Sequence, residues 1–251
     1  MTNIDDKNGN VMLQNTAAKK YSYSLRTMAD YKCQIIEQGF EGTLLKMGNL
    51  EAFMLFVGTF NAYNLTAIYG AAVSLGEDPQ NVLKVLSTLH PVDGRFETIR
   101  SKDGKTAIVD YAHTPDALTN VISTINAIRK DEQQLICVCG CGGDRDKTKR
   151  PEMAREAVKG AQQVVLTSDN PRTEDPVAIL NDMRAGLTEE QLENVLTIVD
   201  RREAIKTAVK IAKSGDIILI AGKGHEDYQD IQGVKHHFDD REEVRKLFGL
   251  E

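Results

Sequence analysis

The chain has 251 residues, of which 41% are hydrophobic and 27% charged, and its formal net charge is -6. This composition is that of an ordinary globular protein, and the length allows one large domain or two smaller ones. The negative charge gives no support to nucleic acid as a partner, because basic surfaces bind polyanions. No apolar run approaches the ~20 residues that span a bilayer, so we expect no membrane insertion. No signal peptide is visible, which favours a cytoplasmic protein.

The N-terminal part of the chain combines short strands with two helices. Residues 1–57 show strand-like alternation, and a hairpin is predicted over 33–47. From Asn61 the apolar spacing becomes that of a helix, which we expect to end at Gly76. A second helix is predicted over 82–89.

Beyond a boundary expected near 90–95, apolar strands alternate with amphipathic helices, so we divide the chain into domains 1–90 and 91–251. The expected strands are 106–111, 135–139, 164–168, 196–199 and 216–221. The expected helices are 115–130, 151–161, 176–187 and 201–213, followed by a hairpin over 228–238 and a last helix over 240–248. This alternation predicts an α/β protein in which a Rossmann-like, mostly parallel sheet follows an incomplete α/β piece.

Two helix starts have clear capping signals. Thr114 precedes Pro115, which is the pattern of an N-cap followed by proline at the first helical position. Asp200 with Glu203 has the spacing of a capping box. We therefore expect helices to begin directly after Thr114 and Asp200.

The stretch 135–151 reads LICVCGCGGDRDKTKRP and predicts a buried strand, a glycine-rich charged loop and a helix start. Glycines such as Gly142 let a ligand approach the backbone, and free N–H groups at a helix start attract anions. A solvated turn is the alternative on these residues alone.

Polar loops follow four of the expected strands, at the edge of the sheet where α/β proteins bind ligands. These loops are 110–113, 140–150, 168–172 and 222–227. Taken singly, His113 or His225 is more often a structural histidine than a catalyst. Four such loops on one edge together favour a binding site.

No phosphate-binding P-loop is found. Residues 104–106, Gly-Lys-Thr, resemble its end, but the glycine required five positions before Gly104 is Ile99. Lys223 precedes Gly224 rather than Ser or Thr, so it fails the pattern as well. Asp103 and Gly104 instead predict a hairpin turn.

The cysteines are expected to be ordinary buried thiols. They are Cys33, Cys137, Cys139 and Cys141, and no second pair or suitably spaced histidine completes a zinc site. We therefore expect no metal ligands in this chain.

Several motifs closely resemble the Mur ligases, which build the peptide of peptidoglycan. The resemblance is carried by VDYAHTPDAL (109–118), GCGGDRDKTKRP (140–151), SDNPRTEDP (168–176) and AGKGHEDYQ (221–229), and extended by GTFNAYN (58–64) and DGRFE (93–97). It covers nearly the whole chain and is strongest to the members that add the third peptide residue to UDP-MurNAc-L-Ala-D-Glu.

The resemblance implies an ATP-dependent amide ligase, in which ATP phosphorylates a carboxylate and an amine displaces the phosphate. It implies that 1–90 is the C-terminal part of the family's central ATPase domain and that 91–251 is its C-terminal domain. The family's P-loop, magnesium ligands and modified lysine have no counterpart here. We therefore expect no catalytic residue in this chain and no turnover by it alone. ATP and Mg²⁺ are expected cofactors of the complete enzyme, and a monomer is expected.

By position, the resemblance implies that four residues contact ATP: Asn64, Arg95, Asp110 and His113. Asp110 would hold the ribose hydroxyls and Arg95 would reach toward the phosphates. The alternatives are a helix N-terminus for Asn64 and an exposed linker charge for Arg95. Asp93 departs from the family pattern, and an acidic group beside Arg95 could weaken a phosphate contact.

The incoming amino acid would be held by Arg145, Asp169, Asn170, Arg172, Gly222 and Glu226. Arginines suit the carboxylates of meso-diaminopimelate, while Asp169 and Glu226 suit an ammonium group. A structural network of ion pairs is the alternative. The Asp-Asn-Pro-Arg sequence ending at Arg172 resembles the family members that add meso-diaminopimelate, and this arginine would read its distal carboxylate. A lysine-adding ligase of the same family, or an amino-acid or nucleotide-binding module without chemistry, are the other hypotheses.

Overall fold

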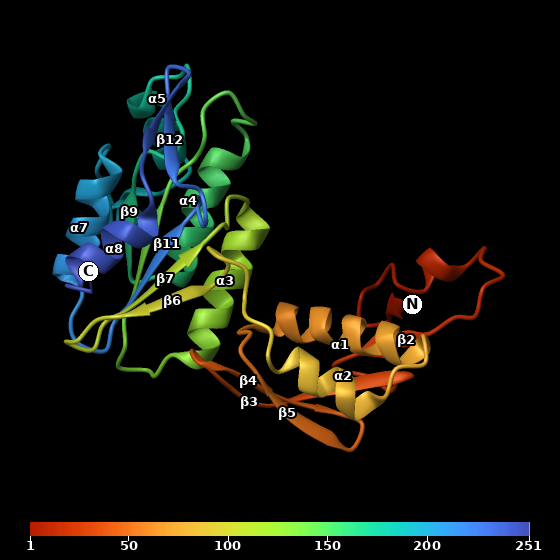
Figure 1. Ribbon diagram of the computed structural model, residues 1–251. Coiled ribbons are helices and arrows are strands. Elements are labelled where there is room, and N and C mark those ends of the chain that lie inside the picture. Colours follow the sequence, from red (N-terminus) through yellow and green to blue (C-terminus); the bar gives the residue numbers. More distant parts are fainter. Residues whose placement is uncertain (251) are drawn as a thin grey trace. The chain divides into compact units, whose positions relative to one another are not determined.

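Figure 1 shows the computed structural model, which describes residues 1–250 and divides into two compact units, Met1–Pro91 and Val92–Glu251. Each unit has its own sheet and its own helices, and each is described separately below.

The first unit contains a five-stranded sheet in the order β1-β2-β3-β4-β5. Its elements are β1 (Thr2–Asn3), η1 (Val11–Leu13), β2 (Ser22–Ser24), β3 (Tyr31–Gly39), β4 (Gly42–Met47), β5 (Leu50–Met54), α1 (Thr59–Ser74) and α2 (Pro79–Leu86). Strands β1 to β3 are parallel, and β3 to β5 are antiparallel. The hairpin expected over 33–47 is present as β3 and β4.

The two helices of this unit bury apolar side chains against the sheet. Leu65 and Tyr69 of α1 and Leu83 of α2 join Leu45 and other strand residues in one core cluster. The second helix begins earlier than expected. The Asp78 side chain accepts a hydrogen bond from the Asn81 N–H at 2.9 Å, so Asp78 is the N-cap and Pro79 occupies the first turn.

The second unit contains a six-stranded sheet in the order β10-β9-β8-β11-β7-β6. Its strands are β6 (Glu97–Arg100), β7 (Thr106–Asp110), β8 (Leu135–Cys139), β9 (Gln163–Leu166), β10 (Val195–Thr197) and β11 (Ile217–Ala221). Five of them are parallel, and only β6 runs antiparallel, beside β7. The predicted α/β class with a mostly parallel sheet is therefore confirmed.

Helices cover both faces of this sheet, with α3, α4 and α5 on one side and α7 and α8 on the other (Figure 1). The helices are α3 (Pro115–Ile128), α4 (Lys149–Gly160), α5 (Pro176–Arg184), α6 (Glu189–Leu192), α7 (Arg201–Ile211) and α8 (Asp240–Leu247). Strands β8 and β11 are buried at every position because both faces are covered, which explains their unbroken apolar sequences. An antiparallel pair, β12 (Tyr228–Ile231) and β13 (Val234–His237), forms the expected hairpin.

Several predicted boundaries were wrong. The strand expected over 164–168 ends at Leu166, so residues 167–168 belong to the following loop. The helix expected from Pro151 begins at Lys149, because proline is tolerated in a first turn, where its missing N–H would have no intrahelical partner. Strand β6 and helix α6 were not predicted as elements. Helix α6 has a capping box, in which Thr188 and Gln191 each accept a hydrogen bond from the other's backbone N–H.

Among residues 1–250, no helix is both long and apolar enough to cross a lipid bilayer.

Candidate functional site

A cavity of about 240 Å³ lies in the second unit, beyond the carboxyl ends of β7, β8, β9 and β11. All four polar loops expected at this edge contribute to it. The lining residues are Tyr111, His113, Gly140, Cys141, Gly142, Arg145, Lys149, Asp169, Asn170, Arg172, Gly222 and Glu226. The six residues proposed from the sequence to hold an amino acid are therefore brought together, and His113 lies with them.

The glycine-rich loop after β8 is joined to the loop after β9. The Gly143 N–H donates to the Asn170 carbonyl at 2.9 Å, and the Thr173 hydroxyl donates to the Asp144 carboxylate at 2.7 Å. A Cβ atom added to Gly143 would lie 1.9 Å from the Pro171 carbonyl oxygen. This glycine therefore allows two loops to approach each other, whereas Gly142 lines the cavity.

A buried arginine stabilises the same two loops. The Arg150 guanidinium donates to both Glu174 carboxylate oxygens, at 2.7 and 3.0 Å, and to Asp182 at 2.8 Å. Hydrogen bonds from Arg150, then from the Asp144 N–H and Lys147, lower the pKa of Glu174 from 4.5 to about 2. This arrangement fixes the end of the glycine-rich loop at the start of α4.

Two charged side chains that line the cavity take part in no hydrogen bond among the described residues. Arg145 forms no hydrogen bond or ion pair there, and the Asp169 carboxylate accepts no hydrogen bond although only 8% of this residue is exposed. The buried Asp169 carboxylate interacts electrostatically with the buried Arg201 guanidinium but has no hydrogen-bond donor, and a ligand ammonium would supply one. Arg145 is exposed, so its guanidinium is open to solvent and to a ligand carboxylate. The cavity therefore offers one accessible positive group and one negative group with free acceptor oxygens.

Arg172 has an uncommon backbone conformation and is hydrogen-bonded to the β12–β13 hairpin. Its φ of 51° lies in the left-handed region, which is uncommon for a residue with a side chain. Its N–H donates to the Asp230 carbonyl at 3.0 Å, and its own carbonyl accepts from the Gln232 N–H at 2.8 Å. The side chain donates from one terminal nitrogen to the Gly143 carbonyl at 2.8 Å. The remaining N–H groups of the guanidinium are unengaged by described residues.

Asn170 and Glu226 share one buried cation, Lys223, which the sequence argument did not select. The Lys223 ammonium lies 3.2 Å from Asn170 Oδ1 and 3.2 Å from Glu226 Oε2, and its side chain is fully buried. The Asn170 amide donates to the same Glu226 oxygen at 2.9 Å. The sequence signal for this residue was a lysine between two glycines, just beyond a buried strand.

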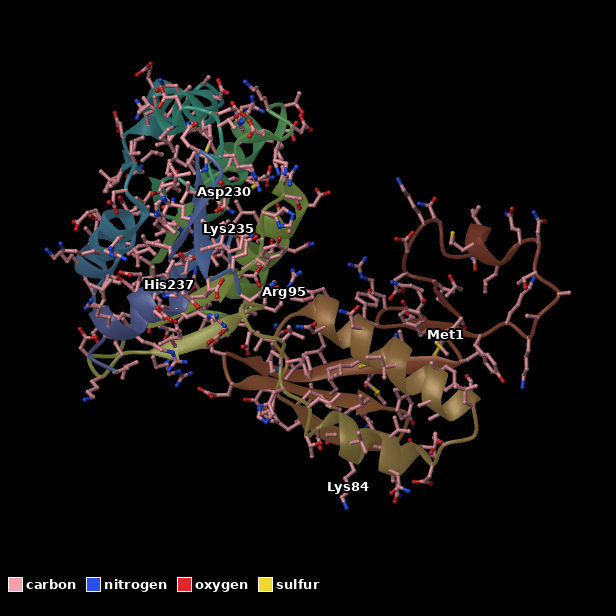
Figure 2. All side chains as sticks on the ribbon, turned by 45° about the horizontal axis from the view of Figure 1, so that its top comes forward. Met1, Lys84, Arg95, Asp230, Lys235 and His237 are labelled. Carbon is pink, nitrogen blue, oxygen red and sulfur yellow. The ribbon has the colours of Figure 1, made fainter. Side chains whose placement is uncertain are left out.

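The residues proposed to contact ATP occupy different places. The Arg95 guanidinium, labelled in Figure 2, lies over the Tyr111 ring at 4.9 Å, and the His113 ring is 4.6 Å from that ring. Asp110 is buried, accepts a hydrogen bond from the Phe96 N–H at 2.7 Å, and does not line the cavity. Burial raises the pKa of the Asp110 carboxyl. Asn64 is exposed on α1 of the first unit.

Asp93 lies in an ion pair of its own. Its carboxylate is 3.4 Å from the Arg241 guanidinium, which also contacts Glu97 and Asp239. Arg95 instead faces the Tyr111 ring. Asp93 therefore pairs with Arg241, a cation that it shares with Glu97 and Asp239.

The four cysteines are buried, as expected, and Cys141 also lines the cavity. Burial raises the pKa of the Cys141 thiol to about 12, so this thiol stays protonated at neutral pH. It is therefore a packing group rather than a nucleophile.

The family model described as the glutamate ligase domain of Mur ligases matches residues 94–224. The chain belongs to the Mur ligase family. This Mur ligase chain is 62% identical over 251 residues to the UDP-N-acetylmuramoyl-L-alanyl-D-glutamate--2,6-diaminopimelate ligase of Parabacteroides distasonis, covering 100% of the chain and 52% of that relative. The ligase of the same name from Bacteroides thetaiotaomicron is 57% identical over 248 residues, with 99% and 52% covered.

A solved structure of a ligase with that name is also similar. It has a TM-score of 0.68 and 42% identity, and the match covers 98% of this chain and 52% of that structure. This Mur ligase chain thus spans about half the length of the relatives it matches. The family assignment and the class of fold expected from the motifs are both confirmed.

Proposed function

We propose that this Mur ligase chain supplies the amino-acid site of an ATP-dependent ligase that joins meso-diaminopimelate to UDP-MurNAc-L-Ala-D-Glu in peptidoglycan synthesis. The observation that carries the proposal is a cavity in which, among the described residues, the exposed Arg145 forms no hydrogen bond or ion pair and the buried Asp169 carboxylate accepts no hydrogen bond. The names of the relatives, and their identity over the whole chain, support the choice of amino acid.

The charges of the cavity complement those of the proposed substrate. Meso-diaminopimelate carries two carboxylates and two amines. Arg145 and the free N–H groups of Arg172 would bind carboxylates, because a guanidinium offers parallel donors to the two carboxylate oxygens. Asp169 and Glu226 would accept hydrogen bonds from ammonium groups. Binding in this way would hold the amino acid in one orientation, which lowers the entropic cost of the amide-forming step.

Arg95, Asp110, His113 and Asn64 remain our proposal for contacts to ATP. The Arg95–Tyr111 stack and the exposed His113 ring offer a cationic and aromatic surface of the kind that suits a nucleotide. The Asp110 carboxylate accepts hydrogen bonds from the Phe96 and Ala112 backbone N–H groups, and its remaining acceptor capacity would serve the ribose. ATP would supply the phosphoryl group that activates the acceptor carboxylate.

The described residues do not fit a magnesium site, since they contain no group of three or more carboxylate, histidine or cysteine side chains able to hold a metal. We propose that the metal and the triphosphate are held by the part of the complete enzyme that corresponds to the other half of the relatives.

The test is calorimetric titration of the chain with meso-diaminopimelate and, separately, with L-lysine. We expect meso-diaminopimelate to bind more tightly, and Arg145→Ala to weaken its binding about tenfold, which corresponds to one lost charge-assisted contact. Arg26→Ala, at an exposed position of the first unit, is the control and should bind as the wild type does. Equal binding of both amino acids, or no effect of Arg145→Ala, would contradict the proposal.

A stand-alone binding module would give the same titration. The ligase and stand-alone-module hypotheses are distinguished by adding the half of a relative that this chain does not match. A ligase fragment then gains amide-forming activity, whereas a stand-alone module does not.

A further inference from the structure

We propose that Lys223 is a positioning residue that fixes the Asn170 amide and the Glu226 carboxylate in the one arrangement that receives a ligand ammonium. The inference rests on the proposed function, because it deepens the role of the same cavity. Lys223 does not line the cavity and is fully buried beneath these two residues, so it would act through them.

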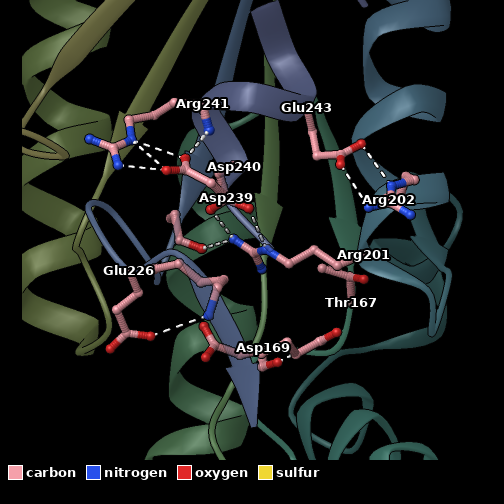
Figure 3. A network of polar contacts seen from close by, with 12 residues as sticks. Thr167, Asp169, Arg201, Arg202, Glu226, Asp239, Asp240, Arg241 and Glu243 are labelled. Atoms are coloured by element: carbon pink, nitrogen blue, oxygen red, sulfur yellow. Dashed lines mark hydrogen bonds and ion pairs between the residues drawn. The ribbon is translucent and has the colours of Figure 1, made fainter. Parts of the chain in front are cut away.

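The partners of the Lys223 ammonium account for its burial. An ammonium has three donors and no acceptor, and a buried charge needs partners that satisfy it. Lys223 finds Asn170 Oδ1 and Glu226 Oε2, each at 3.2 Å, and the Tyr228 ring at 5.4 Å. Both oxygens belong to residues that line the cavity. Figure 3 shows the ion pair that ends at Glu226, with Asp169 close by.

Lys223 is one of three groups that set which way the Asn170 amide points. Asn170 Oδ1 accepts from the Lys223 ammonium and also from the Asp230 N–H at 3.0 Å. A rotated amide would place its NH₂ group against these two donors. The NH₂ group therefore faces Glu226 Oε2, to which it donates at 2.9 Å. Without Lys223, the Asp230 N–H and the Glu226 carboxylate would still favour this orientation, but that carboxylate would itself have lost its cation.

The same contacts leave the two Glu226 oxygens unequal. Oε2 accepts from both Lys223 and Asn170, whereas Oε1 has only a long contact of 3.4 Å from the Tyr111 hydroxyl. One oxygen is thus anchored, and the other remains available to a ligand. An anchored carboxylate loses little rotational freedom when it binds an ammonium group, so the contact is stronger than a freely rotating carboxylate would give.

The first experiment needs no ligand. Crystal structures of the wild-type chain and of Lys223→Met are compared, since methionine keeps most of the length of the unbranched side chain and removes its charge and donors. We expect the Glu226 carboxylate to turn away from Asn170, or the Asn170 amide to rotate. If both side chains keep their wild-type positions, the proposal is wrong. Lys223→Gln is the second variant if Lys223→Met does not fold, and Lys210→Met, at an exposed position of α7, is the control.

The second experiment measures coupling by titration with meso-diaminopimelate. We expect Lys223→Met to weaken binding about 10- to 100-fold, as the loss of one partner from a buried charged pair does. In a Glu226→Gln background the same substitution should weaken binding less than about threefold, because no carboxylate charge remains to be held. An equal loss of affinity from Lys223→Met in the wild-type and Glu226→Gln backgrounds would contradict the positioning role. No binding of meso-diaminopimelate by the wild-type chain would contradict the proposed function instead, and the crystal structures would still decide the role of Lys223.

Discussion

Arg150 and Glu174 form a two-point ion pair, with hydrogen bonds of 2.7 and 3.0 Å, that joins the first turn of α4 to the loop between β9 and α5. The Arg150 side chain is almost fully buried, so its charge depends on this pair and on Asp182. The pair holds together the loop that carries Arg145 and the loop that carries Asp169, Asn170 and Arg172.

The first prediction is a dependence of stability on pH that originates at Glu174. Its pKa is lowered from 4.5 to about 2, so its contribution to stability is fully present above pH 4.5 and is lost as the pH falls toward about 2. We expect Glu174→Gln to be less stable than the wild type at neutral pH and to lose less stability on acidification across this range. Urea unfolding at several pH values measures the difference. Glu190→Gln, at an exposed position of α6, is the control, and parallel curves for Glu174→Gln and wild type would exclude the assignment.

The second prediction concerns the buried ion pair between Arg201 of α7 and Asp240 of α8, both inaccessible to solvent and 2.8 Å apart (Figure 3). Arg201→Met would leave the Asp240 carboxylate buried without a cation, and we expect a loss of about 3–5 kcal/mol in the free energy of unfolding. The double variant Arg201→Met/Asp240→Leu should recover most of this loss, because both charges are then removed. Chemical denaturation measures all three proteins.

The matched control for this pair is Arg202→Met. Arg202 pairs with Glu243 at 2.8 Å, but 57% of its side chain is exposed, so we expect a loss below about 1 kcal/mol. Equal losses for Arg201→Met and Arg202→Met would show that burial does not set the strength of the first pair.

The third prediction is that Arg172 determines the choice between meso-diaminopimelate and L-lysine. The two amino acids differ by one distal carboxylate, and the free N–H groups of Arg172 are available for it. With lysine the guanidinium would lack this partner, at a cost of about 2–4 kcal/mol, or roughly thirty- to a thousandfold in kcat/KM. When the half of a relative that this chain does not match is supplied, the wild-type chain should prefer meso-diaminopimelate by about this factor. Arg172→Ala should lose most of the preference by losing activity on meso-diaminopimelate, and an unchanged ratio would refute the role.

The fourth prediction is that the isolated chain does not form the amide bond. Its sequence has no P-loop, and its described residues contain no magnesium site, so charge on the transferred phosphoryl group would not be neutralised. A radiolabel assay with UDP-MurNAc-L-Ala-D-Glu, ATP and meso-diaminopimelate should give no product above background. Turnover by the isolated chain would overturn this expectation. Supply of the complementary half of a relative is the positive control.

Capping and turn residues could be read from the sequence because their effects are local. Thr114 and Asp200 cap α3 and α7 as expected, each accepting a hydrogen bond from the N–H three residues ahead. Gly104 has a φ of 93° in the turn before β7, where a hairpin was expected. Strand β6 itself was missed, because its short sequence has no strong alternation and its position is determined by pairing with β7.

The sequence alone determined the class of fold and the edge at which the polar loops meet. Apolar strands that alternate with helices can form a parallel sheet, and the carboxyl ends of parallel strands share one edge. That argument brought Arg145, Asp169 and Glu226 to one place. Only the tertiary structure decided which charges pair there, because pairing depends on distances of a few ångströms between residues far apart in the chain. Lys223 reaches Asn170, 53 positions away, whereas Arg145 reaches no partner among the described residues.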